Sequence, residues 1–197
     1  WFFYWAVFSA VLYAFRSLVL RELNLWTAYI STSVWGLCWL AFLPGSAAGY
    51  GPIFTIVMAL PLLSMPLVSK LLNDRYRGAF AGNVSGLAVE VPRLSVLLVV
   101  LVLTIVATPI FPGFFAMLGV LNKSVTLMPQ VAFVVLVIWM LWTWSGIRLL
   151  QGFIVGTGGR CSCEQAVMDI SALRLILMLL PLFIYLLVGL AFSGELL

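Results

Sequence analysis

Side chains that could move a proton or an ion are scarce in this sequence of 197 residues. It holds 10 Lys and Arg, 6 Asp and Glu, and no histidine, so the usual proton shuttle near neutral pH is absent. The ion-path candidates within or beside apolar stretches are Arg16, Lys70, Thr104 and Thr108. A charge inside an apolar segment is expensive and commonly marks an ion path. For Arg16 and Lys70 we favour the alternative, in which a long side chain near a helix end extends to the lipid headgroups.

Metal and nucleotide chemistry find little support in the sequence. Cys161 and Cys163 lie close together, but a metal site would need further ligands, so we interpret them as part of a plain loop. The glycine-rich stretch 156–160 follows no predicted strand and matches neither phosphate-binding nor dinucleotide-binding fingerprints. With no flavin, iron–sulfur or nicotinamide motif either, we expect the chain to bind no metal and no cofactor.

Composition places these few polar groups in a bilayer. Hydrophobic residues make up 64% of the chain and charged residues 8%, whereas soluble domains carry roughly 25% charged residues. Too little polar surface is available to coat a water-soluble globule. A soluble domain, a disordered chain and a nucleic-acid binder are therefore all disfavoured.

Hydropathy predicts an all-α membrane protein with about six transmembrane helices in a single domain, 1–197. The fourth predicted helix is too long for one span and is interrupted between Pro109 and Gly113. Pro109 and Pro112 remove two backbone donors, and a break at membrane depth is tolerated only against protein or a wet cavity. The alternatives are a kinked packing helix or two spans joined by a tight turn. The predicted helices cover residues 1–19, 27–43, 52–72, 94–121, 125–151 and 170–192.

The basic residues segregate if these helices alternate in direction. Lys123 alone falls on the side that holds both termini. The positive-inside rule then places the opposite loops on the cytoplasmic or matrix side. Those loops and helix ends carry the other nine basic residues, which are Arg16, Arg21, Lys70, Arg75, Arg77, Arg93, Arg148, Arg160 and Arg174.

Four stretches, taken in order, resemble one family. They are 20–36, 86–93, 108–115 and 147–152, and they are similar to motifs of the antiporter-like membrane subunits of respiratory complex I, which are related to Mrp antiporters. The resemblance covers only the C-terminal part of that family's unit. It implies a fold of two inverted repeats, each with one discontinuous helix, of which this chain would supply the end of the second repeat and the helices after it.

The departures from the family's pattern concern its proton relay. The resemblance implies ionisable residues just after the helix break and on the helix before it. Our alignment places Met117, Met58 and Leu62 at these positions, and none of these side chains can bind or release a proton. We therefore expect a protein that keeps the family's packing and has lost its proton relay.

Three functions remain open at this stage. We favour a structural, non-pumping membrane-arm subunit of an NADH:quinone oxidoreductase, without catalysis of its own, in contact with other membrane subunits and lipids. Quinone, flavin and iron–sulfur clusters would then belong to partner subunits. The second function is an active ion-translocating module, and the third is an unrelated small transporter or assembly factor. The favoured function implies an energy-transducing inner membrane, mitochondrial by preference or else bacterial.

Overall fold

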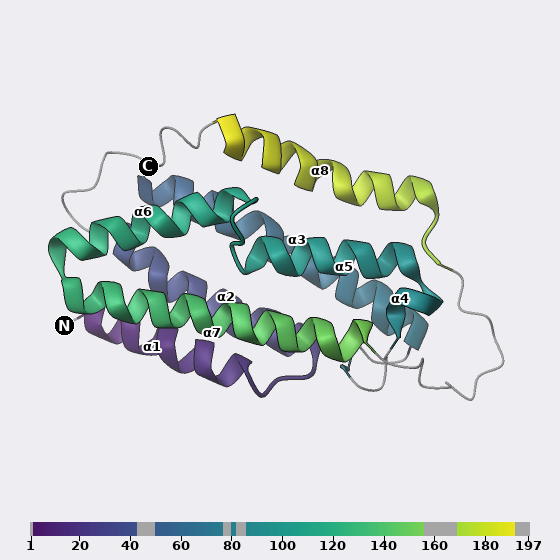
Figure 1. The fold of residues 1–197 in the computed structure, drawn as a ribbon, viewed down its shortest axis with the longest axis horizontal. Helices are drawn as coiled ribbons and strands as arrows, with labels where there is room; N and C mark the ends of the chain where they lie inside the picture. Colours follow the sequence, from purple (N-terminus) through teal and green to yellow (C-terminus); the bar gives the residue numbers. More distant parts are fainter. Residues whose placement is uncertain (1, 43–49, 77–79, 82–85, 156–168, 192–197) are drawn as a thin grey trace.

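A computed structural model describes residues 2–42, 50–76, 80–81, 86–155 and 169–191, which form a bundle of elongated helices (Figure 1). The all-helical prediction is confirmed for this part of the chain, where one isolated antiparallel bridge, Glu22 to Phe80, is the sole β feature. The helices are α1 (Phe2–Ser17), α2 (Leu23–Ala41), α3 (Tyr50–Tyr76), α4 (Leu87–Glu90), α5 (Pro92–Ile105), α6 (Pro112–Leu127), α7 (Pro129–Ile154) and α8 (Ala172–Ala191).

The helices pack around one apolar core. Helix α1 packs against α2 and α7, α3 packs against α2, α5 and α6, and α8 lies along α5 and α6 at one edge of the bundle (Figure 1). Trp26, Phe54, Trp142 and Phe153 are among the largest fully buried side chains. Burial of such large rings from several helices packs these helices against one another.

A buried hydrogen-bond network joins α1, α2 and α7. The indole N–H of Trp142 donates to Ser33 Oγ at 3.0 Å, and Ser33 donates to the carbonyl of Ala10 at 2.7 Å. The indole of Trp26 donates to Ser145 Oγ at 3.2 Å, and Ser145 donates to the carbonyl of Trp142 at 2.9 Å. Each polar group of these buried side chains is thereby satisfied, as an apolar interior requires.

Two glycines allow close helix crossings. A Cβ on Gly36 would lie 2.9 Å from the carbonyl oxygen of Ala6, so α2 approaches the α1 backbone directly. A Cβ on Gly146 would lie 2.7 Å from a methyl group of Val106, which brings α7 against the end of α5. Small residues at such crossings are typical of helix packing in membranes.

Helix boundaries differ from the predicted ones where polar residues suggested loops. Helix α3 continues through Asn73 and Asp74 to Tyr76, and α6 continues through Lys123 to Leu127. These residues are only weakly unfavourable in a helix, so polarity alone does not end one. The boundary falls instead at Pro129, the first residue of α7, where a missing backbone N–H is tolerated.

The starts of two predicted helices also differ from the structure. The predicted loop before residue 94 contains the single turn α4, in which the amides of Val89 and Glu90 donate to the carbonyl of Gly86. Helix α5 then begins at Pro92 rather than at Leu94. Similarly, α2 begins at Leu23, four residues before the predicted start at residue 27.

The surface of the bundle is apolar. Large hydrophobic side chains such as Phe8, Phe133, Met140 and Leu177 are exposed on α1, α7 and α8, which is typical of contact with lipid or partner subunits. Helices α3 and α7 are each long and apolar enough to cross a membrane, whereas α1, α5 and the Ala172–Leu187 part of α8 are shorter apolar helices. The count of about six crossings therefore stays a prediction.

Most of the described basic residues belong to elements that meet at one end of the bundle. The C-terminal ends of α3 and α7 and the N-terminal ends of α5 and α8 lie toward this end, and α1 ends nearer the middle of the bundle (Figure 1). Lys123 lies near the C-terminal end of α6, toward the other end. Arg77 and Arg160 fall outside the described residues, and the sidedness of the loops stays a prediction. The described basic residues of these elements and of the α1–α2 connection are Arg16, Arg21, Lys70, Arg75, Arg93, Arg148 and Arg174.

Candidate functional site at the helix break

The predicted interruption lies between α5 and α6. Helix α5 ends at Ile105, and α6 begins at Pro112 after Phe111, whose backbone is extended at φ −100° and ψ 151°. Ala107 adopts φ 58°, a left-handed conformation unusual for a residue with a Cβ. The prolines at 109 and 112 explain why a regular helix cannot run through this segment.

Packing from α5 and α7 holds the break in place. The indole N–H of Trp139 on α7 donates to the carbonyl of Val106 at 3.0 Å and so satisfies a backbone acceptor freed by the break. A Cβ on Gly113 would lie 3.3 Å from the Cβ of Ala107 and 3.5 Å from the carbonyl of Thr104. Glycine at this position therefore lets the first turn of α6 pack tightly against the end of α5.

The threonines at the break donate to nearby backbone carbonyls. Thr104 is fully buried, and its hydroxyl donates to the carbonyl of Val100 at 2.7 Å. The Thr108 hydroxyl and backbone amide both donate to the carbonyl of Leu103, each at 3.2 Å. Since these hydroxyl protons serve local backbone acceptors, the two side chains stabilise the break itself.

One polar group at the break was not among the predicted site residues, and it comes from α8. The hydroxyl of Tyr185 lies at the backbone amide of Gly113, near the start of α6. It is buried and has no hydrogen-bond partner of normal geometry among the described residues. A Cβ on Gly189, one helical turn further along α8, would collide with Pro112. A tyrosine one turn before a glycine was the available sequence signal, but it did not indicate which helix the pair would meet.

The three positions aligned with the family's relay are apolar and buried. Met58 and Leu62 on α3 are 1% and 6% exposed, and Met117 on α6 is 0% exposed. All three belong to one continuous hydrophobic cluster. Leu62 also borders a groove of about 480 Å³ between α2 and α3, whose polar lining includes Asn24 and Thr27. Thioether and aliphatic carbon at these positions can pack, but they cannot transfer protons.

The charged candidates lie away from the break. Arg16 and Lys70 are both exposed, on the outer faces of α1 and α3. The interpretation in which these charges extend to the lipid headgroups stays a prediction. Lys123, predicted to lie in a loop, is a partly buried residue of α6, and its amine donates to the carbonyl of Ala41 at the end of α2 at 3.2 Å. A cation at the C-terminal end of a helix is favourable for the helix dipole.

The predicted loop features cannot be compared with the structure. Cys161, Cys163 and the glycine-rich stretch 156–160 all lie outside the described residues. Within the described ranges, no group of three or more His, Cys, Asp or Glu side chains is arranged to hold a metal ion.

Comparison with known proteins relates the fold to solved structures. No protein-family model and no curated protein sequence matches the chain. Among solved structures, a chain of respiratory complex I from Thermus thermophilus with bound NADH matches it with a TM-score of 0.83 and 22% identity. The match covers 97% of this chain and 40% of that chain, so this chain spans less than half of the solved one. The chain therefore shares the fold of part of a complex I subunit.

Proposed function

We propose that this chain is a structural, non-pumping membrane subunit of a complex I-type NADH:quinone oxidoreductase, resembling the C-terminal part of an antiporter-like subunit. The observation that carries the proposal is the burial of the apolar residues Met58, Leu62 and Met117 within a fold shared with a respiratory complex I chain. A discontinuous helix without ionisable groups at those positions keeps the packing and gives up proton transfer.

The surface supports assembly in a membrane. Exposed apolar side chains cover the outer faces of α1, α7 and α8, and these faces suit lipids and neighbouring membrane subunits. We propose that the chain resides in an energy-transducing inner membrane, mitochondrial rather than bacterial. Its basic end would face the matrix or cytoplasm, and quinone, flavin and iron–sulfur clusters would belong to partner subunits.

Affinity purification from native membranes tests the assignment to an assembly. The tagged chain, extracted in a mild detergent, is expected to bring down subunits of an NADH:quinone oxidoreductase, identified by mass spectrometry. An unrelated multi-pass protein with the same tag, expressed in the same membrane, is the control. Recovery of the chain alone, or as a homo-oligomer, contradicts the proposal and favours a small transporter or assembly factor.

One observation favours the second candidate function, an ion-translocating module. The break retains a buried Tyr185 hydroxyl without a partner among the described residues, next to the start of α6. The purified assembly in proteoliposomes separates the two functions. With a non-pumping subunit, Tyr185→Phe, Lys70→Met and Thr108→Val leave the number of protons pumped per NADH oxidised unchanged. A lower ratio in any of these variants assigns that residue to an ion path.

A further inference from the structure

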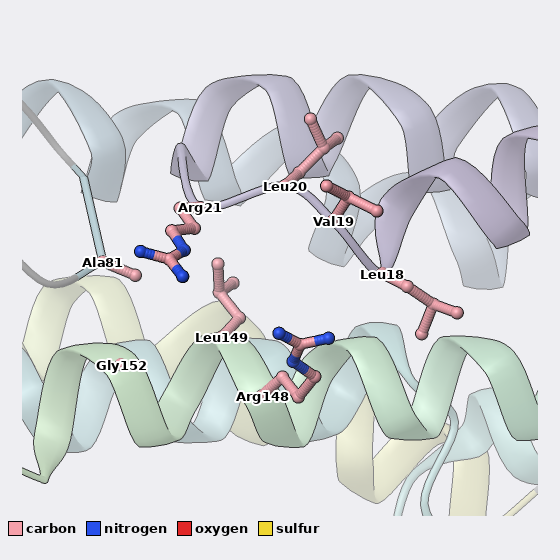
Figure 2. A pocket seen from close by; sticks show the side chains of 8 residues that line it. All are labelled: Leu18, Val19, Leu20, Arg21, Ala81, Arg148, Leu149 and Gly152. Atoms are coloured by element: carbon pink, nitrogen blue, oxygen red, sulfur yellow. The ribbon is translucent and has the colours of Figure 1, made fainter.

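A cavity at the basic end of the bundle contains two arginines. It has a volume of about 210 Å³ and lies between the α1–α2 connection, the segment at Ala81 and the C-terminal half of α7. Figure 2 shows the guanidinium groups of Arg21 and Arg148 pointing into this space from opposite walls, with Leu149 between them. The two charges thus converge on one small volume.

Backbone contacts preform the walls of this cavity. The amide of Ala81 donates to the carbonyl of Arg21 at 2.7 Å, and Glu22 pairs with Phe80 in an antiparallel bridge. A Cβ on Gly152 would lie only 2.7 Å from the Cβ of Ala81, so this segment rests directly on α7. The position of Arg21 is therefore fixed relative to α7, and the pair does not have to be assembled by the ligand.

The positive charge of the lining residues favours an anionic ligand. The described lining residues include two arginines and no Asp or Glu, so the facing positive charges repel each other unless a negative group lies between them. Guanidinium groups bind phosphate oxygens through paired N–H donors in a planar fork. A phosphate between Arg21 and Arg148 would meet such donors from both walls.

Exposed apolar side chains lie beside the arginine on α7. Met140, Trp144 and Arg148 follow one another at four-residue spacing, so neighbouring members of this inclined row are adjacent on the surface of the helix. Met140 and Trp144 line a groove of about 290 Å³, and Arg148 and Gly152 line the cavity. Met140 is 72% exposed and Trp144 63% exposed. An acyl chain can pack against these exposed apolar side chains, whereas a free phosphate gains nothing from contact with them.

We propose that the cavity and this groove together form a binding site for an anionic phospholipid. Its phosphate lies between Arg21 and Arg148, and one acyl chain runs along Met140 and Trp144. Basic pockets between helices at the cytoplasmic or matrix face are suited to anionic headgroups. A zwitterionic headgroup would bring a cation toward the two arginines, so phosphatidylglycerol binds more tightly than phosphatidylcholine. The inference does not depend on membership of a respiratory assembly.

Binding measurements on the full chain in neutral detergent test the site. Short-chain phosphatidylglycerol, phosphatidylcholine and inorganic phosphate are titrated separately, and bound molecules are counted by native mass spectrometry. Arg21→Gln and Arg148→Gln are each expected to weaken phosphatidylglycerol binding about tenfold, through lost charge-assisted hydrogen bonds. Arg174→Gln is the matched control, because Arg174 is exposed on α8 and outside the cavity lining, and it leaves binding unchanged.

Three other outcomes would contradict the proposal, and each points to a different cause. Equal binding of inorganic phosphate and phosphatidylglycerol, with the same arginine dependence, indicates a free-phosphate site. Tighter binding of a hexaglutamate peptide than of the lipid indicates an acidic protein partner. Binding that neither arginine variant weakens shows that the cavity holds no anion. Trp144→Ala supplies an independent check, since it weakens the lipid and leaves inorganic phosphate unaffected.

Discussion

Met117 is the residue where the proposed loss of proton transfer can be tested most directly. It is 0% exposed and belongs to the central hydrophobic cluster. We expect Met117→Lys to lower the free energy of unfolding by about 3 kcal/mol, because a charge would enter an apolar interior without a partner. Met117→Leu, which nearly conserves volume, is expected to cost less than about 1.5 kcal/mol. Denaturation of the purified chain in mixed micelles measures both values, and equal stability of the two variants would mean that the site is hydrated.

Tyr185 offers the opposite test, since its hydroxyl has no hydrogen bond of normal geometry to lose among the described residues. It is buried without a hydrogen bond of normal geometry among the described residues. Tyr185→Phe is therefore expected to leave stability within about 0.5 kcal/mol or to raise it slightly. Tyr76→Phe is the control, because it removes a 3.0 Å hydrogen bond to Glu90 and should lower stability by about 1 kcal/mol. A loss in Tyr185→Phe larger than in the control contradicts this account and reveals a partner for the hydroxyl.

At the level of single residues, the sequence predicted the chemical character of a side chain better than its position in the fold. The apolar character of Met58 and Leu62 follows from residue type alone, and both are buried. The pairing of Arg21 with Arg148 could not be predicted in this way. It depends on the contact of the Ala81 segment with Gly152, between residues far apart in the sequence, and a single sequence carries no periodic signal for such contacts.

At the level of elements, Ser33 links three helices. It accepts from the indole of Trp142 on α7 and donates to the Ala10 carbonyl of α1. Ser33→Ala leaves the buried indole N–H without an acceptor, and we expect stability to fall by about 1 to 3 kcal/mol. Ser31→Ala is the matched control, because Ser31 lies on the surface of α2 and bonds only to its own helix, at Ala28.

The control variant should stay within about 0.5 kcal/mol of the unmodified chain. If Ser33→Ala and Ser31→Ala unfold at the same denaturant concentration, the network does not hold α1, α2 and α7 together. Retention of helical circular dichroism in both variants shows that the comparison concerns packing and not helix formation.

The elements themselves were predictable to different degrees, for physical reasons. Long apolar runs indicate helices without tertiary information, and the proline pair at 109 and 112 located the interruption between α5 and α6. Boundaries at Asn73 and at Lys123 were wrong, because polar side chains at a bundle end continue a helix at little cost. The single turn α4 depends on the carbonyl of Gly86, and a turn of this length carries no periodic pattern.

For the whole molecule, the distribution of charge gives a testable orientation. The C-terminal ends of α3 and α7 and the N-terminal ends of α5 and α8 lie toward one end of the bundle, and the C-terminal end of α6, near Lys123, lies toward the other (Figure 1). Val19 is 77% exposed in the connection after α1, and Thr126 is exposed near the end of α6. These two positions therefore report on opposite ends without disturbing the core.

Single cysteines at these two positions measure the orientation in sealed membrane vesicles. The background replaces the native thiols through Cys38→Ala, Cys161→Ala and Cys163→Ala, and a membrane-impermeant maleimide is the reagent. Because basic ends remain on the cytoplasmic or matrix side, Val19→Cys should react only from that side and Thr126→Cys only from the opposite one. Reaction of both cysteines from one side would mean that the chain does not alternate across the bilayer. The reversed pattern would place the arginine cavity on the far leaflet and remove the electrostatic reason for the proposed orientation.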